Sequence, residues 1–585
     1  MKRYKIVALF LFLGFFATVC ADKKTDEVSK EYKQFLELNE KGILNSVISL
    51  LGGALSVAED AAYTMLTPVQ ELIKENTPAI YENPYRNLNA HVRFGEPIGQ
   101  AELWYRDKRF PRVKAAQEEM LDMNLEYEDV LEIGFSCSGG GWRAMCCAIG
   151  SCVGAQKIGL LDTAMYITSL SGSTWFLGPW MYSGMDIYDY KERAIEIASH
   201  GIKPQSVGET ADLLDNVWVK FAHNQPLNMI DLYGALLGNS LLRGLAIDPH
   251  RVYMTDQRSV IADGEVPLPV YTAVLGERDK DEFWFEFTPY EIGSRWLSSY
   301  VPTWAFGRHF KRGTSKSSAP EQNLGFFMGI FGSAFAADFE DAYEIIVSGI
   351  TFPNFLRHIP FAETVFKAIK KVFAKLAYTD IGDLRVAWGR VPNYVYKLKG
   401  VPHNDYKDLK LVDGGLDCNN PVFAAYRRPP YGDAPDIIFV FDAGQPLKFK
   451  ELQVLVEYAE YNGLKFPQIE KYEIDKQIIA VFKDDTDLDV PVIVYMPAVN
   501  GMGLIQKNSY KEKYNYYLDL LDGFDIEKAS ASGFAHTFNF NYTEREAETL
   551  MAMTEFNILA VEEKIKEIMK ERIHAKRKFR NKKEK

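Results

Sequence analysis

An apolar segment that ends in three consecutive glycines constrains the fold of this chain more than any other feature. Val130 to Ser138 is a run of strand length, and Gly139 to Gly141 lead directly into Trp142 to Ile158, which has helical character. A second apolar run, Ala164 to Leu170, follows, and another helical segment extends through Tyr182. Strands that alternate with helices in this way are the signature of a parallel sheet flanked by helices.

Later apolar runs extend the same pattern. They lie at 266–275, 283–287, 409–412, 436–441 and 490–495. Several run without polar alternation, as strands do when both faces of a sheet are covered. Of the 585 residues, 47% are hydrophobic and 25% are charged, which is ordinary for a globular chain and excludes a disordered or fibrous protein. The sequence therefore predicts an α/β fold, with a mostly parallel central sheet flanked by helices and a cap or lid, for which segment 308–323 is the candidate.

The glycine run is the first candidate for chemistry. Gly139, Gly140 and Gly141 stand between a strand and a helix, where they allow a tight turn and leave backbone N–H groups free at a helix N-terminus. Such a turn binds a phosphate or a developing oxyanion. Arg143 adds a cation suited to phosphate in the first helical turn. The run lacks the lysine of a phosphate-binding loop and the spacing of a dinucleotide fingerprint, so nucleotide binding is not expected.

Ser171 is the candidate nucleophile. It stands in Ser169-Leu170-Ser171-Gly172-Ser173 at a strand-to-helix junction, the position from which a serine projects its hydroxyl out of a sheet. Ser136 also lies near the end of an apolar run, but it precedes the glycines and is expected to lie within the strand. Taken alone, Ser-Gly-Ser is a common loop sequence, so the assignment depends on the other motifs.

Asp413 is the candidate base. It closes the apolar run at 409–412 and is followed by two glycines, which predicts a carboxylate at the end of a strand. No histidine follows Ser171 in a recognisable triad context, so a Ser/Asp dyad fits better than a Ser/His/Asp triad. A free Asp, with a pKa of about 3.9, is a weak base at neutral pH. We therefore expect Asp413 to be buried beside Leu411 and Val412, with a raised pKa, and within hydrogen-bond reach of Ser171.

These motifs resemble the catalytic domain of the group IV cytosolic phospholipase A2 family, which is related to the patatins and to fungal phospholipase B. The resemblance rests on SGGGWRAM at 138–145, SLSGSTW at 169–175, VDGG at 412–415, FEFTPYEIG at 285–293 and FMGIFGSAF at 327–335. It spans roughly residues 100–550. Two positions depart from the family pattern, because Ser169 and Cys137 stand where glycine is usual.

The resemblance implies a role for each candidate. Ser171 would be the nucleophile, Asp413 the base, the N–H groups of Gly140 and Gly141 the oxyanion hole, and Arg143 the contact to the substrate phosphate. The implied activity is hydrolysis of fatty-acyl esters of glycerophospholipids, as a phospholipase A2 or lysophospholipase. Residues 22–100 carry no acidic calcium loops, so calcium independence is expected. Two alternatives stay open: transfer of the acyl group to another acceptor by the same dyad, and a non-catalytic exported lipid-binding protein.

The two ends of the chain predict further segments. The chain starts with the basic residues MKRYK, continues with an uncharged run of 14 residues from Ile6 to Val19, and becomes polar at Asp22. This pattern is typical of an export signal. The expected division is a signal peptide at 1–21, a helical extension at 22–100, a phospholipase catalytic domain with its cap or lid at 101–550, and a C-terminal helix with a basic tail at 551–585. A secreted protein is expected; an uncleaved membrane anchor is the alternative.

Charge indicates the partners. The net charge is −12 although both ends are basic, so the body is strongly acidic and nucleic acid is not an expected partner. The last fourteen residues contain eight Lys or Arg, a composition suited to anionic lipid or to a solvated helix end. A phospholipid surface is the expected partner. The acidic stretch at 484–489 lacks the glycine and the final Glu of a calcium loop, so neither a metal nor another cofactor is expected.

Overall fold

The computed structural model describes most of the chain beyond residue 82. The described residues are 83–202, 219–220, 223–276, 283–339, 387–427, 433–444, 448–469, 477–504 and 514–583. The predicted signal peptide, and the predicted extension up to residue 82, lie outside them.

One large sheet organises the described residues. It has twelve strands in the order β1-β7-β6-β5-β4-β3-β2-β12-β14-β13, and β11 and β10 join it beside β4. The strands are β1 (Arg93–Phe94), β2 (Ile133–Cys137), β3 (Tyr166–Ser169), β4 (Leu268–Leu275), β5 (Trp284–Phe287), β6 (Glu291–Ser294), β7 (Ser299–Pro302), β10 (Gly389–Pro392), β11 (Asp408–Val412), β12 (Ile437–Asp442), β13 (Ala480–Phe482) and β14 (Val492–Pro497). The predicted apolar runs thus all form strands.

The centre of the sheet is parallel and its flanks are antiparallel. Strands β4, β3, β2, β12 and β14 run parallel to their neighbours in that order. Antiparallel strands continue from β4 through β5, β6 and β7 to β1, and β13 closes the other edge. This confirms the predicted α/β fold with a mostly parallel central sheet.

Both faces of the central strands are buried, which explains their unbroken apolar sequences. In β12, Ile437, Phe439 and Phe441 belong to one hydrophobic cluster, while Ile438 and Val440 belong to another on the opposite face. Successive side chains of a strand point to opposite faces, so a strand covered on both sides has no position at which a polar residue is favoured.

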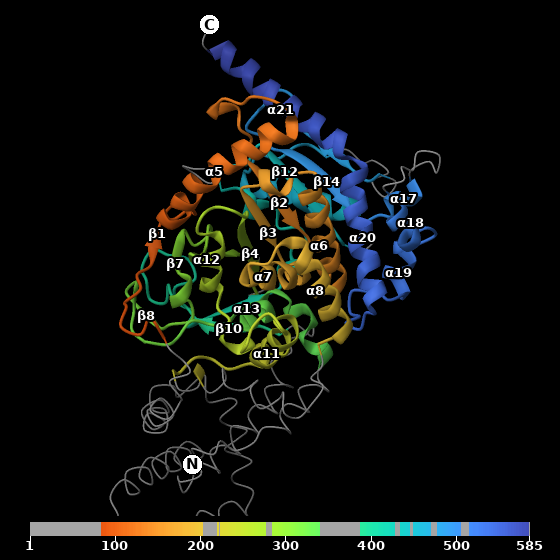
Figure 1. Cartoon of the computed structure of the whole chain (residues 1–585). Coiled ribbons are helices and arrows are strands. Elements are labelled where there is room, and N and C mark those ends of the chain that lie inside the picture. The colour runs from red at the N-terminus through yellow and green to blue at the C-terminus, as the bar shows by residue number, and fades with distance from the viewer. Residues whose placement is uncertain are drawn as a thin grey trace, which may run out of the picture.

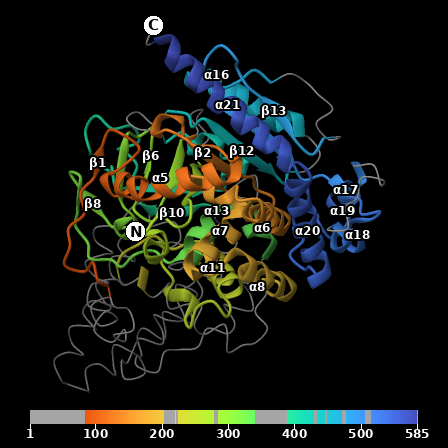
Figure 2. The same cartoon turned by 45° about the horizontal axis from the view of Figure 1, so that its top comes forward.

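Helices cover the sheet. They are α5 (Gln100–Leu121), α6 (Gly141–Lys157), α7 (Thr174–Ser183), α8 (Ile187–His200), α11 (Met229–Leu241), α12 (Arg258–Ile261), α13 (Leu324–Phe331), α16 (Lys448–Asn462), α17 (Gly501–Leu504), α18 (Asn515–Leu521), α19 (Ile526–Ser532), α20 (Glu544–Ala560) and α21 (Glu562–Lys583). Figures 1 and 2 show α6, α7 and α8 gathered on one side of the sheet. Helix α16 packs Leu452 and Leu455 into the cluster on the other side.

Helix α5 begins earlier than the sequence indicates. The sequence predicts the start of a helix only after Pro111, yet α5 starts at Gln100 and continues through that proline. Buried Arg109 joins this helix to the body, because its guanidinium donates hydrogen bonds to backbone carbonyls that include those of Ala164 and Glu265. The described part of the expected helical extension, 83–99, carries the short strand β1 in place of a helix.

Segment 308–323, the candidate cap or lid, is packed against the body. It contains a hairpin of β8 (Phe310–Lys311) and β9 (Thr314–Ser315). Arg308 is fully buried, and its guanidinium donates to the carbonyls of Ala319, Leu88 and Tyr85. Backbone hydrogen bonds also join Val92 to Gly313 and Ser315 to residue 90. This segment is thus an integral part of the fold.

The basic C-terminal segment is helical and contacts the acidic body. Helix α21 runs outward to the C-terminus in Figures 1 and 2. Arg577 and Arg580 form ion pairs of 2.7 and 2.9 Å with buried Asp129, and Lys576 lies 3.0 Å from Asp436. Part of the basic charge is therefore neutralised within the protein. The predicted contact with anionic lipid remains a prediction for the other basic side chains.

Candidate active site

Ser171 lies in a strained turn between β3 and α7. Its φ angle is 50°, a left-handed conformation that costs a residue other than glycine about 1–2 kcal/mol. Hydrogen bonds fix the turn: the Ser173 hydroxyl lies 2.9 Å from the Cys137 carbonyl, and the Thr174 hydroxyl donates to the Ser171 carbonyl over 2.6 Å. This is the strand-turn-helix geometry that projects a nucleophile out of a sheet.

The glycine turn packs directly against this serine. A Cβ at Gly139 would lie 2.8 Å from the Cβ of Ser171, and a Cβ at Gly172 would overlap the carbonyl oxygen of Gly141. Gly140 and Gly141 have φ angles of 136° and 62°, which side-chain-bearing residues rarely adopt. Glycine is therefore required at these positions both for space and for backbone conformation.

The turn presents backbone amides beside the serine. Gly140 is the N-cap of α6 and Gly141 is its first residue, so neither N–H has an acceptor within the helix. The neighbouring Gly139 N–H is already engaged, since it donates to the Asn419 carbonyl over 3.2 Å. The amides of Gly140 and Gly141 are thus suited to an anionic oxygen formed at Ser171.

Asp413 meets Ser171 as expected. The hydroxyl of Ser171 donates to Oδ2 of Asp413 over 2.8 Å, and both residues are buried. The other carboxylate oxygen accepts the Gly415 N–H at 2.9 Å. The Asp413 N–H donates in turn to the Ser333 hydroxyl at 2.9 Å. One carboxylate oxygen is therefore held by the Gly415 N–H and the other is directed at the serine, while Ser333 anchors the backbone of Asp413.

The environment makes Asp413 a stronger base than a free aspartate. Burial raises its pKa from 3.8 to about 7, while hydrogen bonds from the Gly415 N–H, the Ser171 hydroxyl and the Ala334 N–H act in the opposite direction. Desolvation dominates because it penalises the charged carboxylate. A pKa near neutral is where general acid–base catalysis is most effective at neutral pH.

The strand register explains how the two residues meet. Strand β3 pairs with β4 only as far as Ser169, which lies opposite Tyr271, while β4 continues to Leu275. Strand β5 pairs with β4 along the edge opposite to β3. Strand β11 pairs with Val274 and Leu275 on the same edge as β3, beyond the point where β3 ends. Strands β3 and β11 therefore approach each other end to end along β4. Asp413 directly follows β11, at the end of a strand as the sequence predicts, and this strand runs antiparallel to β4.

Arg143 is buried and holds two loops beside the glycine turn. Its Nε donates to the Ala443 carbonyl at 2.7 Å, and its Nη1 donates to the Ala535 carbonyl at 2.8 Å and the Thr537 hydroxyl at 3.0 Å. Burial lowers its pKa. The remaining nitrogen, Nη2, faces the turn, because a Cβ at Gly140 would lie 2.8 Å from it.

Some residues of the site were not singled out from the sequence. Ser333, 80 residues away in sequence, accepts a hydrogen bond from the Asp413 N–H. The Nδ2 of Asn419 donates a hydrogen bond to the Gly139 carbonyl at 3.2 Å. Ser333 lies in the FMGIFGSAF run at 327–335, to which no site role was assigned, and Asn419 has no local signal, since an isolated Asn carries no spacing pattern. Ser136, the alternative serine, is buried in β2 as expected. In the described part of the chain, no cluster of His, Cys, Asp or Glu is suited to a metal, and no helix meets the length and hydropathy of a membrane span.

Solved structures share this fold. Human GIVD cytosolic phospholipase A2 superposes with a TM-score of 0.66 and 22% sequence identity, covering 83% of this chain and 66% of that one. The same human protein in complex with methyl gamma-linolenyl fluorophosphonate gives a TM-score of 0.63 at 22% identity, with the same coverage of both chains.

Curated relatives carry similar sequences. Human cytosolic phospholipase A2 zeta is 26% identical over 523 residues, which are 80% of this chain and 60% of the relative. Mouse cytosolic phospholipase A2 delta is 24% identical over 527 residues, 81% of this chain and 62% of the relative. The chain thus spans about three fifths of the length of these relatives.

The names of the relatives correct one expectation. They are cytosolic phospholipases A2, so the prediction of a secreted protein, based on the apolar run at 6–19, was wrong. An apolar run behind a basic start is a compositional pattern, and such a pattern does not by itself identify an export signal.

A family comparison agrees with the fold and the motifs. The family described as the lysophospholipase catalytic domain matches residues 133–462, more than half of the chain. The match includes the glycine turn, Ser171 and Asp413. The chain therefore belongs to the lysophospholipase catalytic domain family.

Proposed function

We propose that this protein is a phospholipase that cleaves fatty-acyl esters of glycerophospholipids, as a phospholipase A2 or lysophospholipase, through a Ser171/Asp413 dyad. One observation carries the proposal: the buried hydrogen bond of 2.8 Å between the Ser171 hydroxyl and Asp413, beside the turn that contains Gly140 and Gly141. The names of the relatives, all cytosolic phospholipases A2, support the substrate class.

The first half of the reaction acylates the serine. Ser171 Oγ attacks the ester carbonyl carbon while Asp413 accepts the hydroxyl proton. The carbonyl oxygen gains negative charge and accepts hydrogen bonds from the N–H groups of Gly140 and Gly141, each worth about 3–4 kcal/mol in a preorganised site. The bond to the leaving oxygen then breaks, and that oxygen takes the proton from Asp413. A lysophospholipid or glycerophospho alcohol leaves.

The second half repeats these steps with water. Asp413 accepts a proton from water as the water oxygen attacks the acyl carbon, and the same amides hold the second oxyanion. Collapse returns the proton to Ser171 Oγ and releases the fatty acid. No step uses a metal, so we propose that catalysis is independent of calcium.

Product analysis tests this function. Phosphatidylcholine vesicles with a different acyl chain at each glycerol position are incubated with the full chain in EDTA, and the products are identified by mass spectrometry. We expect release of free fatty acid and lysophospholipid. Adding glycerol as an acceptor distinguishes hydrolysis from transfer, because a transferase would form the acylglycerol. Absence of fatty-acid release, or release only with millimolar calcium, would contradict the proposal.

Arg143 provides a second check. We propose that its Nη2 contacts the substrate phosphate while its other nitrogens hold the loops. Arg143→Lys keeps the charge but loses the planar donor set. We expect kcat/KM for lysophosphatidylcholine to fall at least tenfold, and kcat/KM for a monoacylglycerol of the same chain to fall much less. An equal loss for both substrates would assign Arg143 to loop positioning alone.

A further inference from the structure

An amide side chain stands beside the dyad and takes no part in the mechanism described above. Asn419 lies in the segment that follows Asp413, and it contacts the glycine turn through two hydrogen bonds. Its Nδ2 donates to the Gly139 carbonyl at 3.2 Å, and its backbone carbonyl accepts the Gly139 N–H over the same distance. The first bond fixes the orientation of the amide, because a flipped amide would set its oxygen against that carbonyl.

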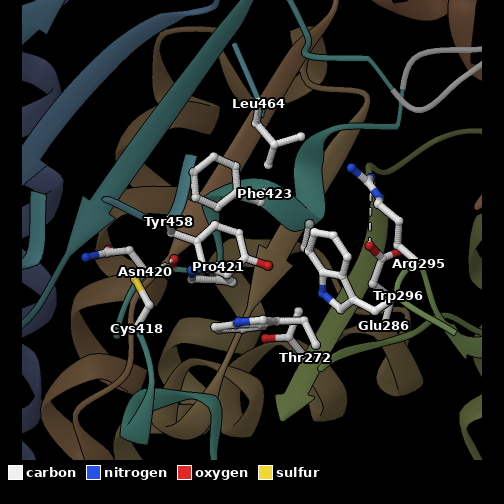
Figure 3. Close-up of a pocket in the computed structure, with 12 residues that line it drawn as sticks. Thr272, Glu286, Arg295, Trp296, Cys418, Asn420, Pro421, Phe423, Tyr458 and Leu464 are labelled. Carbon is white, nitrogen blue, oxygen red and sulfur yellow. Dashed lines mark hydrogen bonds and ion pairs between the residues drawn. The ribbon is translucent and has the colours of Figure 1, made fainter. Parts of the chain in front are cut away.

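The segment that carries Asn419 is anchored on its other side. The neighbours of Asn419 in sequence, Cys418 and Asn420, are buried and line a pocket together with Tyr458 (Figure 3). Asn419 does not line that pocket. Its backbone N–H donates to Glu451 Oε2, from α16, at 3.3 Å. These contacts hold the backbone of the segment in place while the amide of Asn419 is presented to the glycine turn.

The amide oxygen of Asn419 lies close to both residues of the dyad. A Cβ on Gly139 would lie 2.6 Å from Asn419 Oδ1 and 2.8 Å from Ser171 Cβ. A Cβ on Gly415 would lie 3.2 Å from Asn419 Oδ1 and 3.2 Å from Asp413 Oδ1. Asn419 Oδ1 is therefore separated from each dyad residue by no more than the sum of two such distances. That span is comparable to two consecutive hydrogen bonds, about 5–6 Å, which one water molecule bridges.

Asn419 Oδ1 is an acceptor that the protein leaves open. It accepts no hydrogen bond from any described residue, and it is not among the unpaired atoms that are fully buried, so solvent reaches it. The hydroxyls of Ser173 and Thr174, by contrast, donate to backbone carbonyls, and the hydroxyl of Ser333 accepts the Asp413 N–H. An amide oxygen accepts a hydrogen bond without taking up a proton, so it does not compete with Asp413 as the base.

We propose that Asn419 Oδ1 accepts a hydrogen bond from the water that cleaves the acyl-enzyme, and that it thereby favours hydrolysis over acyl transfer to an alcohol. This role rests on the function proposed above. Water has two hydrogens and can donate one to Asp413 and the other to Asn419. A simple alcohol gives its one O–H to Asp413 and leaves Asn419 Oδ1 without a partner. A site built to bind a hydrogen-bond donor discriminates against a competitor that lacks it.

Both hydrogens of the water have a defined destination in this step. The water oxygen forms a bond with the acyl carbon while its first proton passes to Asp413. Its second hydrogen stays on that oxygen and remains hydrogen-bonded to Asn419 Oδ1. The carbonyl electron pair moves to the oxyanion, and its return breaks the bond between the acyl carbon and Ser171 Oγ. Ser171 Oγ takes the proton from Asp413, and the fatty acid leaves with the second hydrogen on its carboxyl group.

Partitioning of the acyl-enzyme between water and ethanol tests this role. The full chain is incubated with phosphatidylcholine vesicles at a fixed concentration of ethanol, and mass spectrometry quantifies ethyl ester and free fatty acid. We expect Asn419→Ala to raise the ratio of ethyl ester to fatty acid about tenfold over wild type. Both nucleophiles give their proton to Asp413, so the ratio does not depend on the ionisation of that group. Leu416→Ala, at an exposed position of the same segment, is the matched control and should keep the wild-type ratio.

Asn419→Asp separates the acceptor of this side chain from its donor. Aspartate keeps an oxygen at the place of Oδ1 but has no N–H for the Gly139 carbonyl. We expect its product ratio to stay close to that of wild type, because the second hydrogen of water still finds an acceptor. A ratio raised as in Asn419→Ala would overturn the proposal, and this variant decides the matter even if Asn419→Ala does not fold.

The rate of labelling by a fluorophosphonate distinguishes water positioning from support of the glycine turn. The reagent forms a P–O bond with Ser171 Oγ without the use of water. The backbone hydrogen bond between Gly139 and Asn419 remains in Asn419→Ala, so we expect labelling at the wild-type rate. A labelling rate that falls as much as fatty-acid release does would overturn the proposal. Absence of fatty-acid release by wild type would overturn the proposed function as well, whereas an active wild type with an unchanged product ratio in Asn419→Ala would overturn this role alone.

Discussion

Replacing Ser171 with alanine is expected to lower kcat for phospholipid hydrolysis by about 10⁴-fold or more, because the covalent route then loses its nucleophile. The residual rate would come from substrate binding and from the amides of Gly140 and Gly141. The measurement is the release of fatty acid from phosphatidylcholine vesicles by purified wild type and variant. The fold should survive, because alanine removes a single oxygen atom, and circular dichroism and thermal melting check this.

A covalent probe tests the same residue without a substrate assumption. A fluorophosphonate forms a P–O bond with an activated serine and releases fluoride, so intact-mass measurement detects a single adduct. We expect the adduct on wild type and none on Ser171→Ala. Ser136→Ala is the matched control, since Ser136 is a buried serine near the same turn, and it should be labelled as wild type is. Labelling of Ser171→Ala would disprove the assigned nucleophile.

Asp413→Asn is expected to lower kcat by about 10³–10⁴-fold, since asparagine can still accept a hydrogen bond from Ser171 but cannot take its proton. On the proposed mechanism, wild-type activity requires the ionised carboxylate. With a pKa of about 7, the ionised fraction rises as pH rises, so kcat/KM should increase from pH 5 to 8 with a midpoint near 7. The residual kcat/KM of Asp413→Asn should not show this increase between pH 5 and 8. A wild-type profile already flat at pH 5 would contradict the raised pKa.

The same carboxyl links stability to pH. Its folded-state pKa, about 7, exceeds its usual value of 3.8, so between these values the folded state binds the proton more tightly than the unfolded state does. The free energy of unfolding contributed by this group therefore falls as pH rises from about 4 to 7. Asp413→Asn removes this contribution to the pH dependence of the free energy of unfolding. We expect the Tm difference, variant minus wild type, to be more positive at pH 8 than at pH 5.

Much of the fold could be predicted from local sequence. Strands β2, β3, β4 and β12 lie in apolar runs bounded by turns, and burial of both faces leaves that pattern plainly in the sequence. The elbow at Ser171 and the turn before α6 were also evident, because their backbone conformations require small residues and glycine at fixed positions.

What could not be predicted depends on contacts distant in sequence. The direction of β11 is set by pairing with the free edge of β4, and no residue within 408–412 encodes it. The contacts of α5 with the body include carbonyls of distant segments that Arg109 reaches. The partners of Arg143 come from loops 300 and 392 residues away in sequence. Local patterns carry no information about such partners.

The pairing of β11 with β4 has a consequence for biosynthesis. The serine and its carboxylate are separated by 242 residues, so Ser171 leaves the ribosome long before its base is made. Until β11 docks, the hydroxyl has no proton acceptor at that edge. On the proposed mechanism, a nascent chain at this stage would not acylate itself on membrane lipids near the translating ribosome, and competence to attack an ester would arise only once the chain beyond residue 413 has folded into place.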